Sequence, residues 1–244
     1  METLDRFETP FSWETLLPAG GTDCGRAYGL SPGWKEAARE AWNVGKKIFR
    51  GTAFLETWDL YGWGEERESV ILRREDDCGE TARNETLFIG PGARHLSGSR
   101  NIVTALCTAG GALEERAQEA ASRGNPLLQY YLNVFGVKAL EHIRLSVQEI
   151  LASRARASGW GVTPSLAPGS LQGWPLEGQK DLFRLTGGEA GGMSINDASF
   201  LTPALSMSFL VGMGPGCAST CVRSLCPDCP RYESCGWRRE NNPL

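Results

Sequence analysis

One stretch of the chain, residues 166–183 (LAPGSLQGWPLEGQKDLF), restricts the possible folds more than any other. Pro168 and Gly169 prevent a helix or strand from continuing through it, and a Gly-Trp-Pro triplet at 173–175 repeats the interruption. From Leu176 the apolar spacing becomes helical. The sequence therefore predicts a shaped loop that leads directly into a helix. Such a loop either contacts a ligand or simply connects a strand to a helix.

The rest of the chain alternates between strand and helix patterns. Apolar residues with period two indicate strands, and apolar residues with a period near 3.6 indicate helices. An irregular arm is expected at 1–30, a core at 31–214, a polar turn at 76–84 and a cysteine-rich tail at 215–244. Strands are expected at 53–63, 69–74, 87–90, 101–108 and 204–214, and helices at 34–49, 112–123, 127–135, 137–156 and from 176.

The cysteines are concentrated at the C-terminal end, where five of the eight follow Gly216. Intracellular thiols stay reduced, so a disulfide framework is not expected. The C-x2-C spacing of Cys226 and Cys229 lets two thiolates on a tight turn bind one metal ion or cluster. The tail is therefore predicted to bind zinc or a 4Fe–4S iron-sulfur cluster, with a disulfide, a redox relay or an inert tail as alternatives. The candidate ligands are Cys217, Cys221, Cys226, Cys229 and Cys235.

An ordered set of features extends from the Pro-Gly loop to the last strand. The loop is followed by a helix with Gln179 and Phe183, a Gly-rich turn at 192–197, a Thr-Pro step at 202–203 and a Ser-x-Ser strand. Together these features resemble the activation (reactivation) domain family of vitamin B12 (cobalamin)-dependent methionine synthase. They are most similar to its small stand-alone relatives that occur with corrinoid proteins and methyltransferases. Residues 87–111 and the helices after them extend the resemblance upstream.

The resemblance implies an α+β fold, with a twisted, mainly antiparallel sheet and flanking helices. It also implies a role in reductive reactivation of a cobalamin-dependent methyltransferase. The family binds S-adenosylmethionine over the corrin of its partner, so that reduction of the cobalt is coupled to methyl transfer. The partner implied here is a corrinoid protein or such a methyltransferase, which carries the cobalamin.

The residues that the resemblance assigns to the ligand are Glu141, Ala167, Pro168 and Gly169, and Trp174 adds an aromatic surface or a core side chain. Two positions depart from the family. Ser165 stands where the family has an arginine, and Ser170 where it has a tyrosine. Because serine cannot replace the charge-assisted hydrogen bonds of arginine, S-adenosylmethionine binding is doubtful.

Glu141 has two possible roles. On its helix it is expected to point away from Arg144, so it is either solvated or directed at the ligand. His142 and His95 lack a second ligand at metal-binding spacing and are predicted to be structural or surface residues.

Charge and motifs exclude several functions. The formal net charge is −4 and basic runs are short, so nucleic acid is not an expected partner. Apolar runs are too short to span a membrane, and a cytoplasmic protein is expected. Hydrolase, kinase and dinucleotide motifs are missing. Three functions remain: a reactivation accessory protein, a non-catalytic corrinoid-binding module with a structural zinc tail, and a metal-binding redox or sensory protein.

Overall fold

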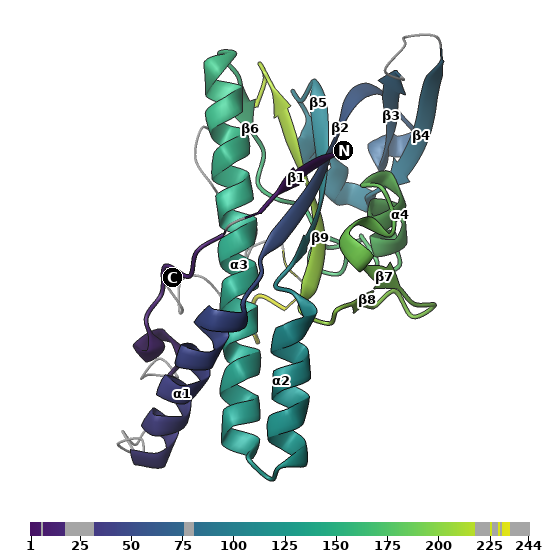
Figure 1. The fold of residues 1–244 in the computed structure, drawn as a ribbon. Coiled ribbons are helices and arrows are strands. Elements are labelled where there is room, and N and C mark those ends of the chain that lie inside the picture. The colour runs from purple at the N-terminus through teal and green to yellow at the C-terminus, as the bar shows by residue number, and fades with distance from the viewer. Residues whose placement is uncertain are drawn as a thin grey trace.

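The chain forms a seven-stranded sheet in which every pairing between described strands is antiparallel (Figure 1). Its order is β4-β3-β2-β5-β9-β6, and β1 also pairs with β2. The structure is a computed structural model that describes residues 1–5, 7–17, 32–75, 81–217, 225, 229 and 231–234. The strands are β1 (Glu2–Leu4), β2 (Thr52–Trp63), β3 (Ser69–Glu75), β4 (Ala82–Phe88), β5 (Asn101–Thr108), β6 (Gly161–Val162) and β9 (Ser206–Gly214).

Helices cover both faces of this sheet. The α-helices are α1 (Pro32–Ile48), α2 (Gly111–Ser122), α3 (Pro126–Ala157) and α4 (Gly178–Leu185). Short 3-10 helices are η1 (Trp13–Leu16), η2 (Glu65–Arg67), η3 (Gly90–Leu96) and η4 (Ala190–Gly192), and β7 (Ser194–Ile195) pairs with β8 (Leu201–Thr202). The predicted α+β fold with a mainly antiparallel sheet and flanking helices is therefore confirmed. Within the described residues, no helix combines the length and apolar character needed to cross a membrane.

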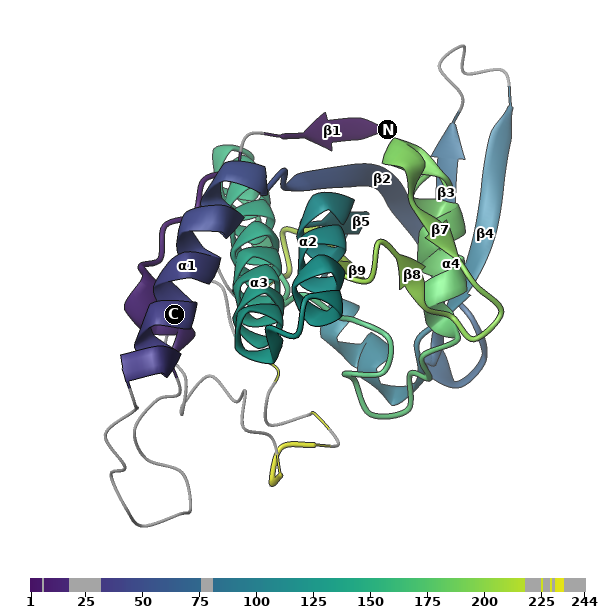
Figure 2. The ribbon, with the colours of Figure 1, turned by 60° about the horizontal axis from the view of Figure 1, so that its bottom comes forward.

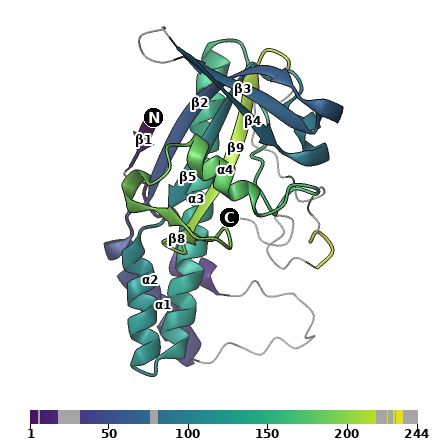
Figure 3. The ribbon, with the colours of Figure 1, turned by 90° about the vertical axis from the view of Figure 1, so that its right-hand side faces the viewer.

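The two faces of the sheet pack against different layers. On β5, Val103 and Ala105 belong to the cluster that includes α1, α2 and α3, whereas Ile102 and Leu106 pack on the opposite face against the region of α4. This follows from the alternation of side chains along a strand. Figure 2 shows α1, α2 and α3 side by side. In Figure 3, α1, α2 and the first half of α3 extend beyond the end of the sheet, while the second half of α3 runs along it.

The helix α3 differs from the prediction of two helices, because it continues through Gly136. A Cβ at Gly136 would lie 2.3 Å from Leu205 Cδ1. The glycine thus allows Leu205 to approach the helix closely, and it does not end the helix. The predicted helix start is confirmed, since Asn125 Oδ1 accepts a hydrogen bond from the backbone N–H of Leu128 at 3.1 Å.

Two further predictions are wrong, and both concern segments that form a strand by pairing with a neighbouring strand. The arm was expected to be irregular, but β1 pairs with β2, with Glu2 opposite Leu55. The polar turn was expected to extend to Asn84, but 82–84 belong to β4, where Asn84 pairs with Arg73. Both segments form edges of the sheet and carry polar side chains, so neither has an apolar alternation. The predicted boundary at residues 30–31 lies outside the described residues.

Candidate functional site

The Pro-Gly loop, defined as residues 163–177, starts as an extension of the sheet. The backbone N–H of Thr163 donates to Gly212 O at 2.8 Å, and Leu166 and Leu210 exchange two backbone hydrogen bonds. After Pro168 the chain turns back on itself, and the N–H of Gly169 donates to Trp174 O at 2.9 Å. The sheet therefore fixes one end of the loop, and this backbone bond closes the turn.

Glycines let the Pro-Gly loop pack directly on η3. A Cβ at Gly92 would lie 2.0 Å from Leu171 Cδ2, and one at Gly173 would lie 2.6 Å from Pro91 Cδ. A Cβ at Gly90, whose φ is 73°, would lie 2.5 Å from the carbonyl oxygen of Gly173. The two segments that carry the family resemblance, residues 87–111 and the Pro-Gly loop, are thus in contact. These glycines allow the close packing between them.

Trp174 lies inside the protein. Its side chain is 2% exposed and packs in a cluster with Leu166, Leu171 and Leu182. Its Nε1 is buried near Gly178 at the start of α4, with no hydrogen-bond acceptor among the described residues. The structure therefore favours the core alternative for Trp174 over an exposed aromatic surface.

A polar cluster on α3 contacts the Pro-Gly loop. Arg144 donates from Nε and Nη2 to the two carboxylate oxygens of Glu141 at 2.6 and 2.5 Å. Its Nη1 donates to Ser165 Oγ at 2.6 Å and to Gln148 Oε1 at 3.2 Å. Gln148 Nε2 donates to Thr163 O at 3.2 Å. The structure thus joins Glu141 to the loop through Arg144.

The expected orientation of Glu141 is wrong. Residues three apart share one side of a helix, so Glu141 and Arg144 form an ion pair, with Arg144 only 13% exposed. Sequence reasoning did not select Arg144 as a site residue, although the i, i+3 spacing was visible. Its guanidinium lies beside Ser165, the position where the family resemblance placed an arginine. The helix therefore supplies a positive charge at this place.

Two other titratable side chains lie on the same helix. Burial lowers the pKa of Lys138 and of His142. His142 Nε2 lies 3.3 Å from Ser146 Oγ, within hydrogen-bond distance. Lys138 is 7% exposed.

The remaining ligand candidates line the outer part of the loop. Pro168 is buried, Ala167 is half-buried against the helical cluster, and Gly169 is exposed with φ of 74°. Ser170 is exposed, and its N–H donates to Ala167 O at 3.2 Å. Ligand binding by these residues stays a prediction.

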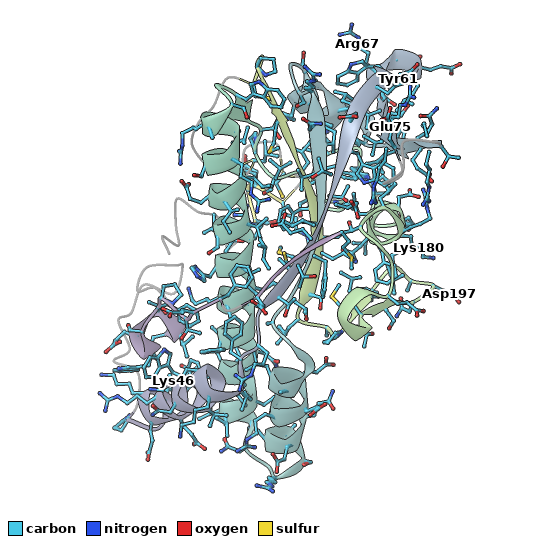
Figure 4. The ribbon with its side chains drawn as sticks, turned by 45° about the horizontal axis from the view of Figure 1, so that its top comes forward. Lys46, Tyr61, Arg67, Glu75, Lys180 and Asp197 are labelled. Atoms are coloured by element: carbon cyan, nitrogen blue, oxygen red, sulfur yellow. The ribbon has the colours of Figure 1, made fainter. Side chains whose placement is uncertain are left out.

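A hairpin formed by β7 and β8 is attached to the helix that follows the loop. Gln179 Nε2 donates to Ser199 O at 2.6 Å, and Ser208 Oγ lies 3.3 Å from Gln179 Oε1. Lys180 Nζ donates to Asp197 O at 2.7 Å, and both residues are labelled in Figure 4. The side chain of Gln179 therefore joins α4, the hairpin and β9, which were separate motifs in the sequence.

The start of the cysteine-rich tail is held against the turn at 97–100. Gly216 N donates to Gly98 O at 3.1 Å, and Cys217 Sγ lies 3.4 Å from Ser99 Oγ. Burial raises the pKa of the Cys217 thiol, and the hydrogen bond with Ser99 opposes this effect. Farther along, Leu225 packs against the cluster that contains Trp174.

The predicted metal site stays a prediction. Cys217 and Cys229 are free thiols, and both are half-buried. Cys221, Cys226 and Cys235 lie outside the described residues. Among the residues that the structure describes, no group of three or more His, Cys, Asp or Glu side chains could hold a metal ion.

The fold is that of a known class of α+β domain. A solved structure described as "Crystal Structure of the MetH Reactivation Domain bound to AdoHcy" matches 88% of this chain and 78% of its own chain. The TM-score is 0.52 and the sequence identity is 14%, so the similarity establishes the fold alone. No protein-family model matches the chain. No curated protein matches it in sequence either.

Proposed function

We propose that this chain is an accessory protein for the reductive reactivation of a cobalamin-dependent methyltransferase. The observation that supports the proposal best is the structural similarity over 88% of the chain to the MetH reactivation domain. In this proposal the cysteine-rich tail supplies or relays the electron that such a reduction requires. The proposed partner is a corrinoid protein or cobalamin-dependent methyltransferase in the cytoplasm, where the tail thiols would stay reduced.

The proposed ligand is of the S-adenosylmethionine class, since the similar solved structure contains AdoHcy (S-adenosylhomocysteine). In this chain Glu141 would face the ligand from α3, and Ala167, Pro168 and Gly169 from the loop. Arg144 is already paired with Glu141, so it contributes less attraction for a ligand carboxylate than an unpaired arginine would. We expect S-adenosylmethionine to bind at least ~100-fold more weakly than to an arginine-containing relative, from a loss of roughly 3 kcal/mol.

The reactivation experiment follows the partner's cobalt spectroscopically. A methyltransferase in its inactive Co(II) form is mixed with this chain, S-adenosylmethionine and a one-electron reductant under anaerobic conditions. Loss of the Co(II) signal, with one AdoHcy formed per cobalt methylated, supports the proposal. No acceleration over the reductant and S-adenosylmethionine alone, with every available corrinoid partner, would contradict it.

The tail is tested by metal analysis and visible spectroscopy of protein purified anaerobically. An iron-sulfur cluster gives brown protein with broad visible absorption and supports a redox role. Replacing Cys226 by Ser should remove the metal, whereas replacing the buried Cys107 by Ala should retain it. Colourless protein that contains one zinc ion per chain would favour the second candidate, a corrinoid-binding module with a structural zinc tail. Because Trp174 is buried, it does not offer that candidate an aromatic surface for a partner.

A further inference from the structure

The layer formed by α1, α2 and α3 covers only part of one face of the sheet. On β2, Ala53 and Leu55 belong to the core cluster that these helices share. Thr57, Asp59 and Tyr61 continue the same face of the strand, but all three are exposed. In Figures 1 and 2, β3 and β4 lie on the side of the sheet away from α1 and α3. We call this uncovered part the open face, with the residues Asp59, Tyr61, Ile71, Arg73, Thr86 and Phe88.

The opposite side of these strands is already packed. On β3, Ile71 and Arg73 alternate with Val70 and Leu72, which are fully buried in the cluster that includes residues of α4. Strand pairing places Asp59 of β2 directly opposite Arg73 of β3. The open face is therefore the second side of a sheet whose first side is buried, and its side chains lie next to one another.

Two large aromatic side chains are exposed on the open face. Tyr61 is 61% exposed and Phe88 is 48% exposed, and Figure 4 labels Tyr61 at this end of the sheet. The pairing of β2 with β3 shifts register between Leu60 and Gly62, so Tyr61 occupies a β-bulge, a feature that redirects side chains. Aromatic residues and arginine are enriched in protein–protein interfaces. The open face thus has the composition of a protein-binding surface.

Arg73 is held in place while it retains unused hydrogen-bond donors. Its guanidinium carbon lies 5.1 Å from the centroid of the Tyr61 ring. Its Nε is buried without an acceptor among the described residues, and Nη2 lies 3.7 Å from Glu75 Oε1, longer than a hydrogen bond. Asp59 accepts a hydrogen bond from Asn101 Nδ2 at 2.7 Å on one of its two carboxylate oxygens. The open face therefore presents a donor group beside an acceptor group.

We propose that the open face binds the open face of a second copy of this chain in a two-fold symmetric dimer. A surface in such a contact must be complementary to itself. The open face meets this condition, because Arg73 of one copy pairs with Asp59 of the other and the contact occurs twice. Tyr61, Ile71 and Phe88 are then buried between two sheets packed face to face. A polyanion such as nucleic acid is a poorer occupant, since a carboxylate lies beside the basic group. The dimer is independent of the proposed function.

The first experiment measures the mass of the unmodified chain by sedimentation equilibrium, over a concentration series that reaches the millimolar range. The expected result is a reversible change from the mass of one chain to the mass of two. Tyr61→Asp and Phe88→Asp should each raise the dissociation constant of the dimer about tenfold or more. Phe200→Asp is the matched control and should not change it, because Phe200 is 60% exposed but lies between β7 and β8. Thermal unfolding verifies that each variant is folded.

Two results of this experiment would overturn the proposal. One is a chain that stays monomeric throughout the series. If Tyr61→Asp then weakened binding to a corrinoid protein, the open face would belong to that partner instead. The other is a dimer whose dissociation constant is unchanged by Tyr61→Asp and Phe88→Asp, because the dimer would then use another surface.

A charge exchange tests the two-fold contact itself. Asp59→Lys places a positive charge against Arg73 of the other copy, and Arg73→Glu places a negative charge against Asp59. Each variant alone should therefore dimerise more weakly than the unmodified chain. An equimolar mixture of the two variants should form a mixed dimer, because every such contact then joins opposite charges. Partial unfolding cannot produce restored association, and a mixture that associates no better than either variant alone would overturn the two-fold arrangement.

Discussion

Replacing Trp174 by Ala should destabilise the protein strongly, because the indole is buried. A buried tryptophan removes roughly 150–250 Å² from water, which at about 25 cal/mol per Å² is worth about 4–6 kcal/mol. Truncation of a buried aromatic ring costs about 3–5 kcal/mol in practice. The buried Nε1 has no acceptor among the described residues, and removing this polar group offsets about 1–3 kcal/mol of that loss. We therefore expect the free energy of unfolding to fall by about 3 kcal/mol.

The assay is thermal unfolding, followed by binding to a corrinoid protein at a temperature where the variant is folded. For a domain of this size, about 3 kcal/mol corresponds to a decrease of roughly 6–12 °C in Tm. Leu176→Ala is the matched control, because Leu176 is 37% exposed at the end of the same loop and should cost about 1 kcal/mol or less. An unchanged Tm together with weaker corrinoid-protein binding would refute the core assignment and make Trp174 a partner contact.

Two further predictions concern packing and pH. Gly90→Ala should destabilise the protein by about 1–3 kcal/mol more than Gly124→Ala, measured by chemical denaturation. Both glycines have φ near 73° (73° and 72°), but a Cβ at Gly90 would lie 2.5 Å from a carbonyl oxygen, whereas Gly124 has open space around it. Equal losses would show that η3 and the loop are not tightly packed. A hydrogen bond from Arg154 is the main reason that the pKa of Glu2 lies below 4.5. The stabilisation is therefore present above pH 4.5 and lost as the pH falls through the lower folded-state pKa. The Tm difference between the unmodified chain and Arg154→Gln should vanish in acid, and a difference that persists there would contradict this origin.

The sequence determined the elements whose signals are local. The apolar run at 101–108 predicted β5, which is buried on both faces. The alternation at 204–214 predicted β9, because successive side chains of a strand point to opposite faces of the sheet. The helix predicted to begin at 127 begins at Pro126 in the structure, and Asn125 caps it, so local residues that restrict the backbone and supply a cap define the start of α3. The Pro-Gly loop was likewise predicted by its backbone-restricting residues.

Tertiary structure decided which residues meet at the site. Arg144 and Ser165 are 21 residues apart, and they interact because the chain after α3 returns along the edge of the sheet beside that helix. The approach of Leu205 to Gly136 and the burial of Trp174 also depend on packing between segments that are far apart in the sequence. A few neighbouring residues fix backbone conformation through sterics and hydrogen bonding, and the sequence displays them directly. Contacts between distant segments depend on how whole layers pack, so no short pattern specified which side of α3 the loop would meet.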